Sequence, residues 1–242
     1  MMKPTKIRYK RVLLKLTGEL FGGGKGKKGI DFSEVERIAS YLHNLHKKTG
    51  VELAIVVGAG NLLRARELAG TPIDRVTADH IGMLGTIMNA LALQEGLERF
   101  GSVIRTMSSL NVQSVCEPFI RRRAVRHLEK GRIVILAGGT GNPFFTTDSA
   151  AALKASELDC EILLKGSNID GVFSADPKID KNAKFYREIS FQTAIKRGLM
   201  VMDNTAFALC QQERIPIVVF NINELDNIEK VLRGEKIGTL IN

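Results

Sequence analysis

The chain has 242 residues, of which 44% are hydrophobic and 25% are charged, and its formal net charge is +9. This composition excludes a disordered or fibrous protein and predicts a single folded domain over residues 1–242. The longest apolar run, residues 53–60, is far too short to span a bilayer, and the N-terminus lacks the pattern of a secretory signal, so we expect a cytoplasmic protein without a membrane partner.

Short apolar runs alternate with longer amphipathic stretches along almost the whole chain. Their near-continuous Val, Ile and Leu content predicts strands that are buried on both faces. The expected strands are 11–16, 52–57, 102–105, 132–137, 160–165, 216–220 and 239–241. The expected helices are 33–48, 79–100, 118–130, 149–157, 190–196, 205–213 and 227–232. This alternation predicts an α/β fold, a three-layer αβα sandwich around a mostly parallel central sheet.

The first strand ends in Lys15-Leu16-Thr17-Gly18-Glu19. A lysine at a strand exit can direct its ammonium group at a phosphate, while the Thr-Gly turn lets backbone amides approach the same group. An ordinary strand-exit lysine is the alternative. The helix that follows opens with Ser33 and Glu36, which predicts a capping box.

The second strand is followed by Gly58-Ala59-Gly60-Asn61, with Arg64 one helical turn onward. Bare backbone amides at the start of a helix favour an anion, and the planar guanidinium of Arg64 could bind the same phosphate. A tight structural turn would also use glycines.

The segment from Gly138 to Ser149 joins an expected buried strand to an alanine-rich helix. Packing does not require its three glycines, three threonines and Asn-Pro step, so we expect its hydroxyl and amide groups to bind a sugar and a base. Asp148 could orient nearby lysines, or simply cap the helix.

A further strand exit carries Lys165 and then a loop rich in Gly, Asn, Asp and Pro over residues 166–186. This loop offers a second lysine, polar groups and Phe173, which together suit a purine nucleotide. Phe173 could instead belong to the core.

Three further sequence features say less about function than these loops do. The chain has no Gly-x4-Gly-Lys-[Ser/Thr] motif, and residues 24–29 match Gly-x-Gly-x-x-Gly without directly leaving a strand, so we interpret them as a cationic loop. The three cysteines lack metal spacing and are expected to be buried in a reducing compartment. The basic cluster of Arg121 to Arg123 with Arg126 is interpreted as a solvated helix face, with a subunit interface or an effector-phosphate site as alternatives.

Taken together, these segments resemble the bacterial UMP kinases of the amino-acid kinase superfamily, from Lys10 to Ile241. The resemblance rests on motifs at 15–19, 58–64, 78–83, 140–148, 170–177, 201–203 and 234–240. The 140–148 run is highly specific, whereas the short glycine turns are shared across the superfamily.

The resemblance implies that an N-terminal half, roughly 1–150, holds UMP and that a C-terminal half, roughly 151–242, holds ATP. The residues implied to face UMP are Ala59, Asp79, Thr140, Gly141, Asn142, Pro143, Phe144, Phe145, Thr146 and Thr147. The residues implied to face ATP are Lys15, Leu16, Thr17, Gly18, Gly60, Arg64, Ser167, Asn168, Phe173 and Asp176. Lys15, Arg64 and Lys165 would neutralise charge on the transferred group, and Asp148 would hold the lysines rather than act as a base.

The resemblance also implies a homohexamer, Mg²⁺ carried by the nucleotide with no metal site of the protein's own, ATP as co-substrate, UDP as a precursor in pyrimidine nucleotide synthesis, and GTP and UTP as effectors. Two departures stand out. Ala59 occupies a position that is usually Gly, which would disfavour a positive φ there. The 24–29 loop has Lys27-Lys28 where GTP-regulated members often have Phe, which puts GTP activation in doubt.

Three other functions stay open. A kinase for a small carboxylate or carbamate would lack the nucleoside-reading segment, and a non-catalytic nucleotide sensor would not need both lysines and Asp148. A nucleic-acid-binding regulator fits the net charge, but aromatic residues do not interleave with the basic ones.

Overall fold

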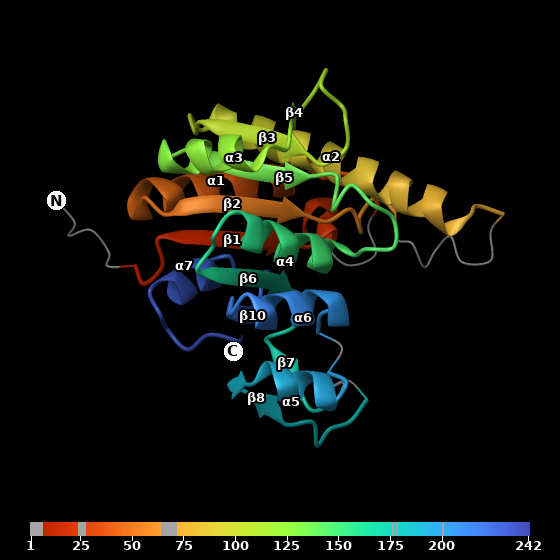
Figure 1. Ribbon diagram of the computed structural model, residues 1–242. Helices are drawn as coiled ribbons and strands as arrows, with labels where there is room; N and C mark the ends of the chain where they lie inside the picture. The colour runs from red at the N-terminus through yellow and green to blue at the C-terminus, as the bar shows by residue number, and fades with distance from the viewer. Residues whose placement is uncertain (1–6, 24–27, 64–71, 176, 178, 200) are drawn as a thin grey trace.

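A computed structural model describes residues 7–23, 28–63, 72–175, 177, 179–199 and 201–242. Its central sheet has the strand order β4-β3-β5-β2-β1-β6-β10-β11-β9 (Figure 1). The strands are β1 (Arg11–Leu16), β2 (Glu52–Val57), β3 (Ile104–Ser108), β4 (Glu117–Pro118), β5 (Ile133–Ala137), β6 (Ile162–Ser167), β9 (Glu188–Ile189), β10 (Ile217–Asn221) and β11 (Thr239–Ile241). Neighbouring strands run parallel except β10 and β11, which confirms the predicted mostly parallel sheet.

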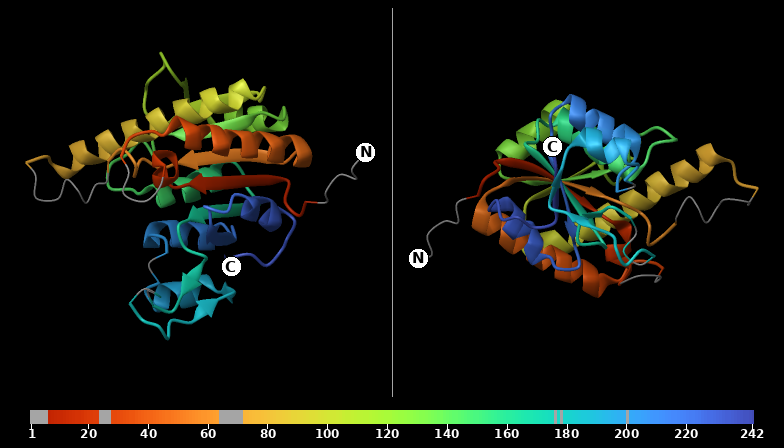
Figure 2. Two further views of the ribbon diagram at one scale, coloured as in Figure 1. Left: turned by 180° about the vertical axis from the view of Figure 1, so that it is seen from behind. Right: turned by 90° about the horizontal axis from the view of Figure 1, so that it is seen from below.

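Helices cover both faces of this sheet, which confirms the predicted three-layer architecture (Figure 2). Three helices pack on one face with one part of the core: α1 (Phe32–Thr49), α2 (Arg75–Arg99) and α7 (Asp226–Leu232). Four pack on the other face: α3 (Arg121–Glu129), α4 (Thr147–Glu157), α5 (Phe191–Lys196) and α6 (Asn204–Gln212).

The alternation of side chains along β1 assigns each residue to one of these two faces. Val12, Leu14 and Leu16 pack with α1 and α2, whereas Leu13 packs on the opposite side with α4. Because side chains on a strand alternate with a period of two, Lys15 lies on the same side as Leu13. The sequence of the first strand therefore places its one charged interior residue beneath α4.

Several element boundaries differ from the predicted ones. β3 begins at Ile104 rather than Ser102, because Gly101 has a left-handed φ of 85° that ends the preceding helix. α3 begins at Arg121 rather than Pro118, since Glu117 and Pro118 pair with β3 instead. The predicted boundaries were therefore off by two or three residues, which moves no site residue.

The predicted cap of one helix and the predicted start of another were wrong. Asp31, not Ser33, caps α1, and its carboxylate accepts the backbone N–H of Ser33 at 3.0 Å. α2 starts at Arg75, four residues before the predicted start, because Asp74 accepts the N–H of Thr77 at 3.0 Å. In both places an aspartate carboxylate caps the helix, and it fixes the helix start upstream of the residue at which the sequence analysis began the helix.

The loop predicted over residues 166–186 contains a hairpin of two short strands, β7 (Val172–Phe173) and β8 (Phe185–Tyr186), which form a second sheet. The 3₁₀ helix η1 (Gly18–Gly22) and β9 were also missed. Two-residue strands show no hydrophobic periodicity, so sequence patterns cannot reveal them.

The three cysteines are free and buried, as the sequence predicted. Burial raises the pKa of the Cys160 thiol and of the Cys210 thiol to about 12. Within the part of the chain that the structure describes, no helix has the length and hydrophobicity needed to span a membrane.

Candidate functional site

The two predicted lysines lie side by side in the middle of the sheet. Lys15 of β1 and Lys165 of β6 are direct register partners on neighbouring parallel strands, whose backbones are about 4.8 Å apart. The strands that follow β1 in the chain, from β2 to β5, lie on one side of it, whereas β6 and the later strands of this sheet lie on the other side. The strand order therefore reverses at β1. In open α/β sheets, ligands bind at the carboxyl ends of strands on either side of such a switch point.

Asp148 lies between the two lysines. Lys15 Nζ is 3.1 Å from Asp148 Oδ1, and Lys165 Nζ donates a hydrogen bond to Asp148 Oδ2 at 2.5 Å. Burial alone would raise the pKa of Asp148, but the two ammonium groups outweigh it and hold the pKa below its ordinary value of 3.8. Asp148 is therefore ionised at neutral pH and neutralises one of the two adjacent positive charges.

Lys165 is slightly more buried than Lys15 and has one more hydrogen-bond partner. It also donates to the backbone carbonyl of Val201. Burial, together with the charge of Lys15, lowers the pKa of Lys165 below its ordinary value of 10.5, against the opposing effect of Asp148. The arrangement therefore presents a net positive, largely desolvated cluster at the carboxyl end of the sheet, which suits a polyanion.

The start of α4 delivers Asp148 to this cluster. Thr146 caps the helix, since its hydroxyl accepts the N–H of Asp148 and of Ser149, so the alternative in which Asp148 is the cap is wrong. Thr146 and Ser149 both donate to the carboxylate of Asp203, which itself caps α6 by accepting the N–H of Ala206 at 2.8 Å. Asp203 thus fixes the position of the first turn of α4 against α6.

The turn after β1 and the turn after β2 touch each other. A Cβ built on Gly18 would lie 2.2 Å from the backbone N of Gly60, so only glycine allows this approach. Thr17 precedes η1, while Leu16 is fully buried in the core and offers only its carbonyl, which accepts the N–H of Gly58 at 2.9 Å. The predicted phosphate-binding glycines therefore converge, while the side chain of Leu16 lies in the core.

Ala59 is buried in this turn, and it is not among the non-glycine residues with a positive φ. The strain expected from a residue larger than Gly is therefore absent. A Cβ on Gly85 of α2 would lie 3.0 Å from the methyl group of Ala59, so α2 approaches the turn closely at this glycine. Arg64 lies outside the described residues.

The segment after β5 forms a glycine-rich loop above the sheet. Gly138, Gly139 and Gly141 all have left-handed φ values, between 57° and 82°. Thr140 accepts the N–H of Asn142 at 3.2 Å, and Pro143 follows. These contacts fix a bend that leaves Thr140, Gly141, Asn142, Pro143 and Thr147 at least partly accessible.

The far end of this loop is held by α2. Asp79 accepts the backbone N–H of Phe144 at 2.7 Å and also pairs with Arg75. Phe144 has a left-handed φ of 73° and is 63% exposed, and Phe145 is also exposed. Two exposed aromatic rings on a strained loop are typical of a ligand-facing segment.

The residues after β6 lie at the same end of the sheet. Ser167 ends the strand, and Asn168 donates to Glu19 of η1 at 2.5 Å, which links the β1 and β6 exits. Phe173 packs edge-on against Phe185 with ring centroids 5.1 Å apart. Asp176 lies outside the described residues.

A cavity of about 370 Å³ opens beside these two rings. Part of its polar lining comes from the exits of two parallel strands, where Asn221 donates to Asp170 at 2.9 Å, and Arg187, Glu224 and Asn227 supply the rest. An aromatic wall opposite amide and carboxylate groups can receive a purine base.

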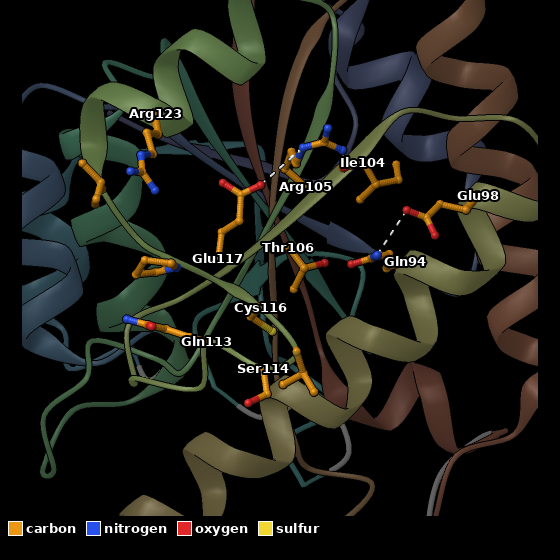
Figure 3. Close-up of a pocket in the computed structure, with 13 residues that line it drawn as sticks. Gln94, Glu98, Ile104, Arg105, Thr106, Gln113, Ser114, Cys116, Glu117 and Arg123 are labelled. Atoms are coloured by element: carbon orange, nitrogen blue, oxygen red, sulfur yellow. Dashed lines mark hydrogen bonds and ion pairs between the residues drawn. The ribbon is translucent and has the colours of Figure 1, made fainter.

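A second cavity, of about 750 Å³, lies away from the lysines, between α2, β3 and the chain leading into β4 (Figure 3). Arg105 and Glu117 point toward each other across it at 3.3 Å, and Arg123 faces it from α3. Thr106 is buried in its lining, and its hydroxyl has no hydrogen-bond partner. The basic cluster is thus divided, because Arg121 instead pairs with Asp159.

Three residues that hold the site-forming loops were given no role by the sequence analysis. Asp203, Thr86 and Asn89 contact these loops, but each sits where an ordinary helix cap or helix polar residue would be expected. For Asp203 a signal existed, since an aspartate directly before an amphipathic stretch predicts a cap. Across the described residues, no three His, Cys, Asp or Glu side chains gather where they could share a metal ion.

Comparison with known proteins adds to this geometry. The model of the amino acid kinase family matches residues 10–221. The chain is 48% identical over 237 residues to a uridylate kinase of Methylococcus capsulatus, covering 98% of both chains. It superposes on UMP kinase from Bacillus anthracis with a TM-score of 0.91 at 40% identity, covering 97% and 96% of the two chains. UMP kinase from Ureaplasma parvum gives a TM-score of 0.88 at 35% identity, covering 98% and 100%.

Proposed function

This chain belongs to the amino acid kinase family, and from that premise we propose that it is a UMP kinase, which transfers the γ-phosphoryl group of ATP to UMP and releases UDP and ADP. The observation that carries the proposal is the Lys15–Asp148–Lys165 cluster at the switch point of the sheet. Uridylate kinase and UMP kinase relatives that match nearly the full chain support the same activity.

Phosphoryl transfer demands little covalent chemistry from the protein. The two nucleotides must be brought into line, and the charge that spreads over the moving group must be stabilised. Lys15 and Lys165 would supply fixed positive charge, and Arg64 is proposed to assist. The phosphate of UMP is already ionised, so no general base is needed, and Asp148 acts by holding the lysines.

Magnesium would enter on the nucleotide. The described site is rich in ammonium groups, and its central carboxylate is already paired with two lysines, so phosphate oxygens are the better ligands for the ion. Mg²⁺ would there neutralise charge on the β- and γ-phosphates.

We assign the acceptor to the N-terminal half of the chain, roughly 1–150, and ATP to the C-terminal half, roughly 151–242. The glycine-rich loop of residues 138–147, held by Asp79, supports the acceptor side through its accessible hydroxyl and amide groups. The cavity beside Phe173 supports the placement of adenine, since it opens beyond the last residues of β6, two positions past Lys165.

An exposed apolar stripe on α2 supports assembly with further copies. Leu84 and Met88 are 48% and 54% exposed and lie near Ile81 on one helix face. Figure 1 shows the first turns of α2 projecting beyond the sheet. Such a stripe marks an interface, and the family resemblance implies a homohexamer. Leu84→Lys with Met88→Lys should lower the solution mass measured by light scattering, whereas an unchanged mass would place the interface elsewhere.

The cavity lined by Arg105 and Arg123 is a candidate site for an effector nucleotide. The guanidinium group of Arg123 suits a phosphate, while that of Arg105 is paired with Glu117, and the unpartnered Thr106 hydroxyl suits a further polar contact. GTP and UTP are the effectors that the family resemblance implies. The effect of GTP is measured separately, because Lys27-Lys28 stands in the 24–29 loop where GTP-regulated members of the family often have Phe.

Turnover with ATP, Mg²⁺ and each nucleoside monophosphate in turn tests the proposed function. We expect UMP to be the preferred acceptor, and GTP and UTP are added in separate arms. Turnover with a small carboxylate or carbamate but not UMP would contradict the proposal, as would salt-sensitive binding to duplex DNA without any turnover. Production of UDP would support a role in pyrimidine nucleotide synthesis, and we propose that the protein acts in the cytoplasm, where UMP and ATP are found.

A further inference from the structure

Two asparagine side chains form a buried amide pair beneath the glycine turn that follows β2. Asn61 is 1% exposed and Asn89, in the middle of α2, is fully buried. Asn89 Nδ2 donates to Asn61 Oδ1 at 2.7 Å, and Asn61 Nδ2 donates to Asn89 Oδ1 at 3.1 Å. The remaining N–H of each amide is also used, so all four donors of the pair are satisfied.

Each amide of the pair also donates one hydrogen bond to a backbone carbonyl outside the pair. Asn89 donates to the carbonyl of Gly58, at the exit of β2, at 2.8 Å. The side-chain amide of Asn61 donates to the backbone carbonyl of Gly29 at 2.8 Å, and the backbone carbonyl of Asn61 accepts the N–H of Gly29 at 2.9 Å. The pair therefore fixes both ends of the Gly58-Ala59-Gly60 turn and ties it to the end of the 24–29 loop.

A polar pair at this position is not required for packing. Its neighbours on α2 include Ile87, Ala90 and Leu93, which are buried apolar residues of the core. Apolar side chains of the same size would fill this space but would leave the carbonyls of Gly58 and Gly29 without donors, whereas the fully satisfied polar network specifies one arrangement. The benefit of the pair is therefore the geometry that it gives the turn.

Another side chain of α2, three residues before Asn89, holds the backbone of the loop that follows β5. The hydroxyl of Thr86, which is buried, accepts the N–H of Gly138 at 2.8 Å and donates to the carbonyl of Met83 at 2.6 Å. Gly138 is the first residue after β5 and has a left-handed φ of 75°. One helix thus grips the first residue of each glycine loop.

We propose that α2 sets the spacing between the two nucleotides through these grips: Asn89, acting with Asn61, positions the Gly58-Ala59-Gly60 turn, and Thr86 positions the loop that receives UMP. The inference rests on the proposed function, because it assigns Gly60 of the turn to ATP, Ala59 of the same turn to UMP, and the second loop to UMP alone. All three are positioning residues, since each acts on backbone that would contact a nucleotide.

The two grips can be released separately with isosteric changes. The double variant Asn61→Leu/Asn89→Leu is expected to lower kcat/KM at least about ten-fold for ATP and also for UMP, because the turn that it loosens would contact both nucleotides. Thr86→Val is expected to raise KM for UMP by about two- to ten-fold, the effect of one hydrogen bond, without changing KM for ATP. Thr86→Ser, which keeps the hydroxyl, should restore the KM for UMP.

Unfolding midpoints are measured alongside, and the double variant should melt at a lower temperature than the unaltered protein, since the carbonyls of Gly58 and Gly29 lose their donors. Equal changes in both KM values in Thr86→Val, or an unchanged kcat/KM in the folded double variant, would overturn the inference. If the double variant does not fold, the Val and Ser variants of Thr86 decide it, since equal KM values for UMP would refute the grip on the acceptor loop. The unaltered enzyme is assayed first, and a lack of UMP turnover there would contradict the proposed function instead.

Discussion

Replacing Lys15 with alanine is expected to lower kcat by at least about 100-fold, comparable to the loss of one main electrostatic group in an active site. Lys15 lies in register with Lys165 and only 3.1 Å from Asp148, so its ammonium group is fixed at the carboxyl end of the sheet. The variant should fold, since Asp148 keeps its hydrogen bond to Lys165. Steady-state turnover with saturating ATP and UMP measures the change.

Lys10→Ala provides the matched control for this variant. Lys10 directly precedes β1, its side chain is 78% exposed, and it pairs only loosely with Glu52 at 3.5 Å. Removal of its charge should leave kcat unchanged, because a solvated ion pair contributes little. Near-normal turnover in folded Lys15→Ala protein would remove Lys15 from the mechanism.

Asp148→Asn is expected to lower both stability and activity. The substitution leaves two ammonium groups on neighbouring strands without their shared counter-ion, and breaking a buried charge pair costs roughly 3 kcal/mol or more of unfolding free energy. Asp159→Asn is the control, since Asp159 is an exposed aspartate with a left-handed φ of 54°, a conformation that asparagine tolerates. Urea denaturation of the three proteins measures the difference.

The pH dependence of the same variants separates charge from packing. The pKa of Asp148 in the folded protein is below its ordinary value of 3.8, so its stabilising effect is fully present above about pH 4 and is lost as the pH falls through the lowered pKa. The unaltered protein should therefore lose stability more steeply than Asp148→Asn in acid. If the unfolding free energies of the two proteins fell in parallel below pH 4, this prediction would be contradicted.

On the alkaline side, activity should follow the protonation of Lys165. Burial lowers the pKa of Lys165 and Asp148 raises it, so removal of Asp148 should lower this pKa further. Since only the protonated lysine neutralises phosphate charge, the alkaline fall in kcat should move to lower pH in Asp148→Asn. A purely structural role for Asp148 would leave the position of that fall unchanged.

The sequence predicted the layers of the fold and the main charged residues of the site, because both depend on local pattern. Lys15 and Lys165 each end a strongly apolar strand, and Asp148 follows a run of glycine and threonine that packing does not require. The register that makes the two lysines direct neighbours was not predictable, since it depends on the strand order β2-β1-β6.

The residues that sequence reasoning missed share one property. Asn89, Thr86 and Asp203 act on the backbone or the helix start of another element, so their role depends on contacts between residues 28 to 57 positions apart. In the sequence, Asn89 is only a polar residue within an amphipathic helix. Its burial and its partner Asn61 become visible only when α2 is laid against the exit of β2.

The pairing of β1 with β6 also has a consequence for biosynthesis. Lys15 of β1 is translated 150 residues before its register partner Lys165. Until then one edge of β1 stays without its β6 partner, and such distant pairing slows sheet formation. A nascent chain stalled before Ile162 would hold the glycine turns of β1 and β2 but could not close the charge cluster, so the growing polypeptide gains catalytic competence only once β6 has been translated.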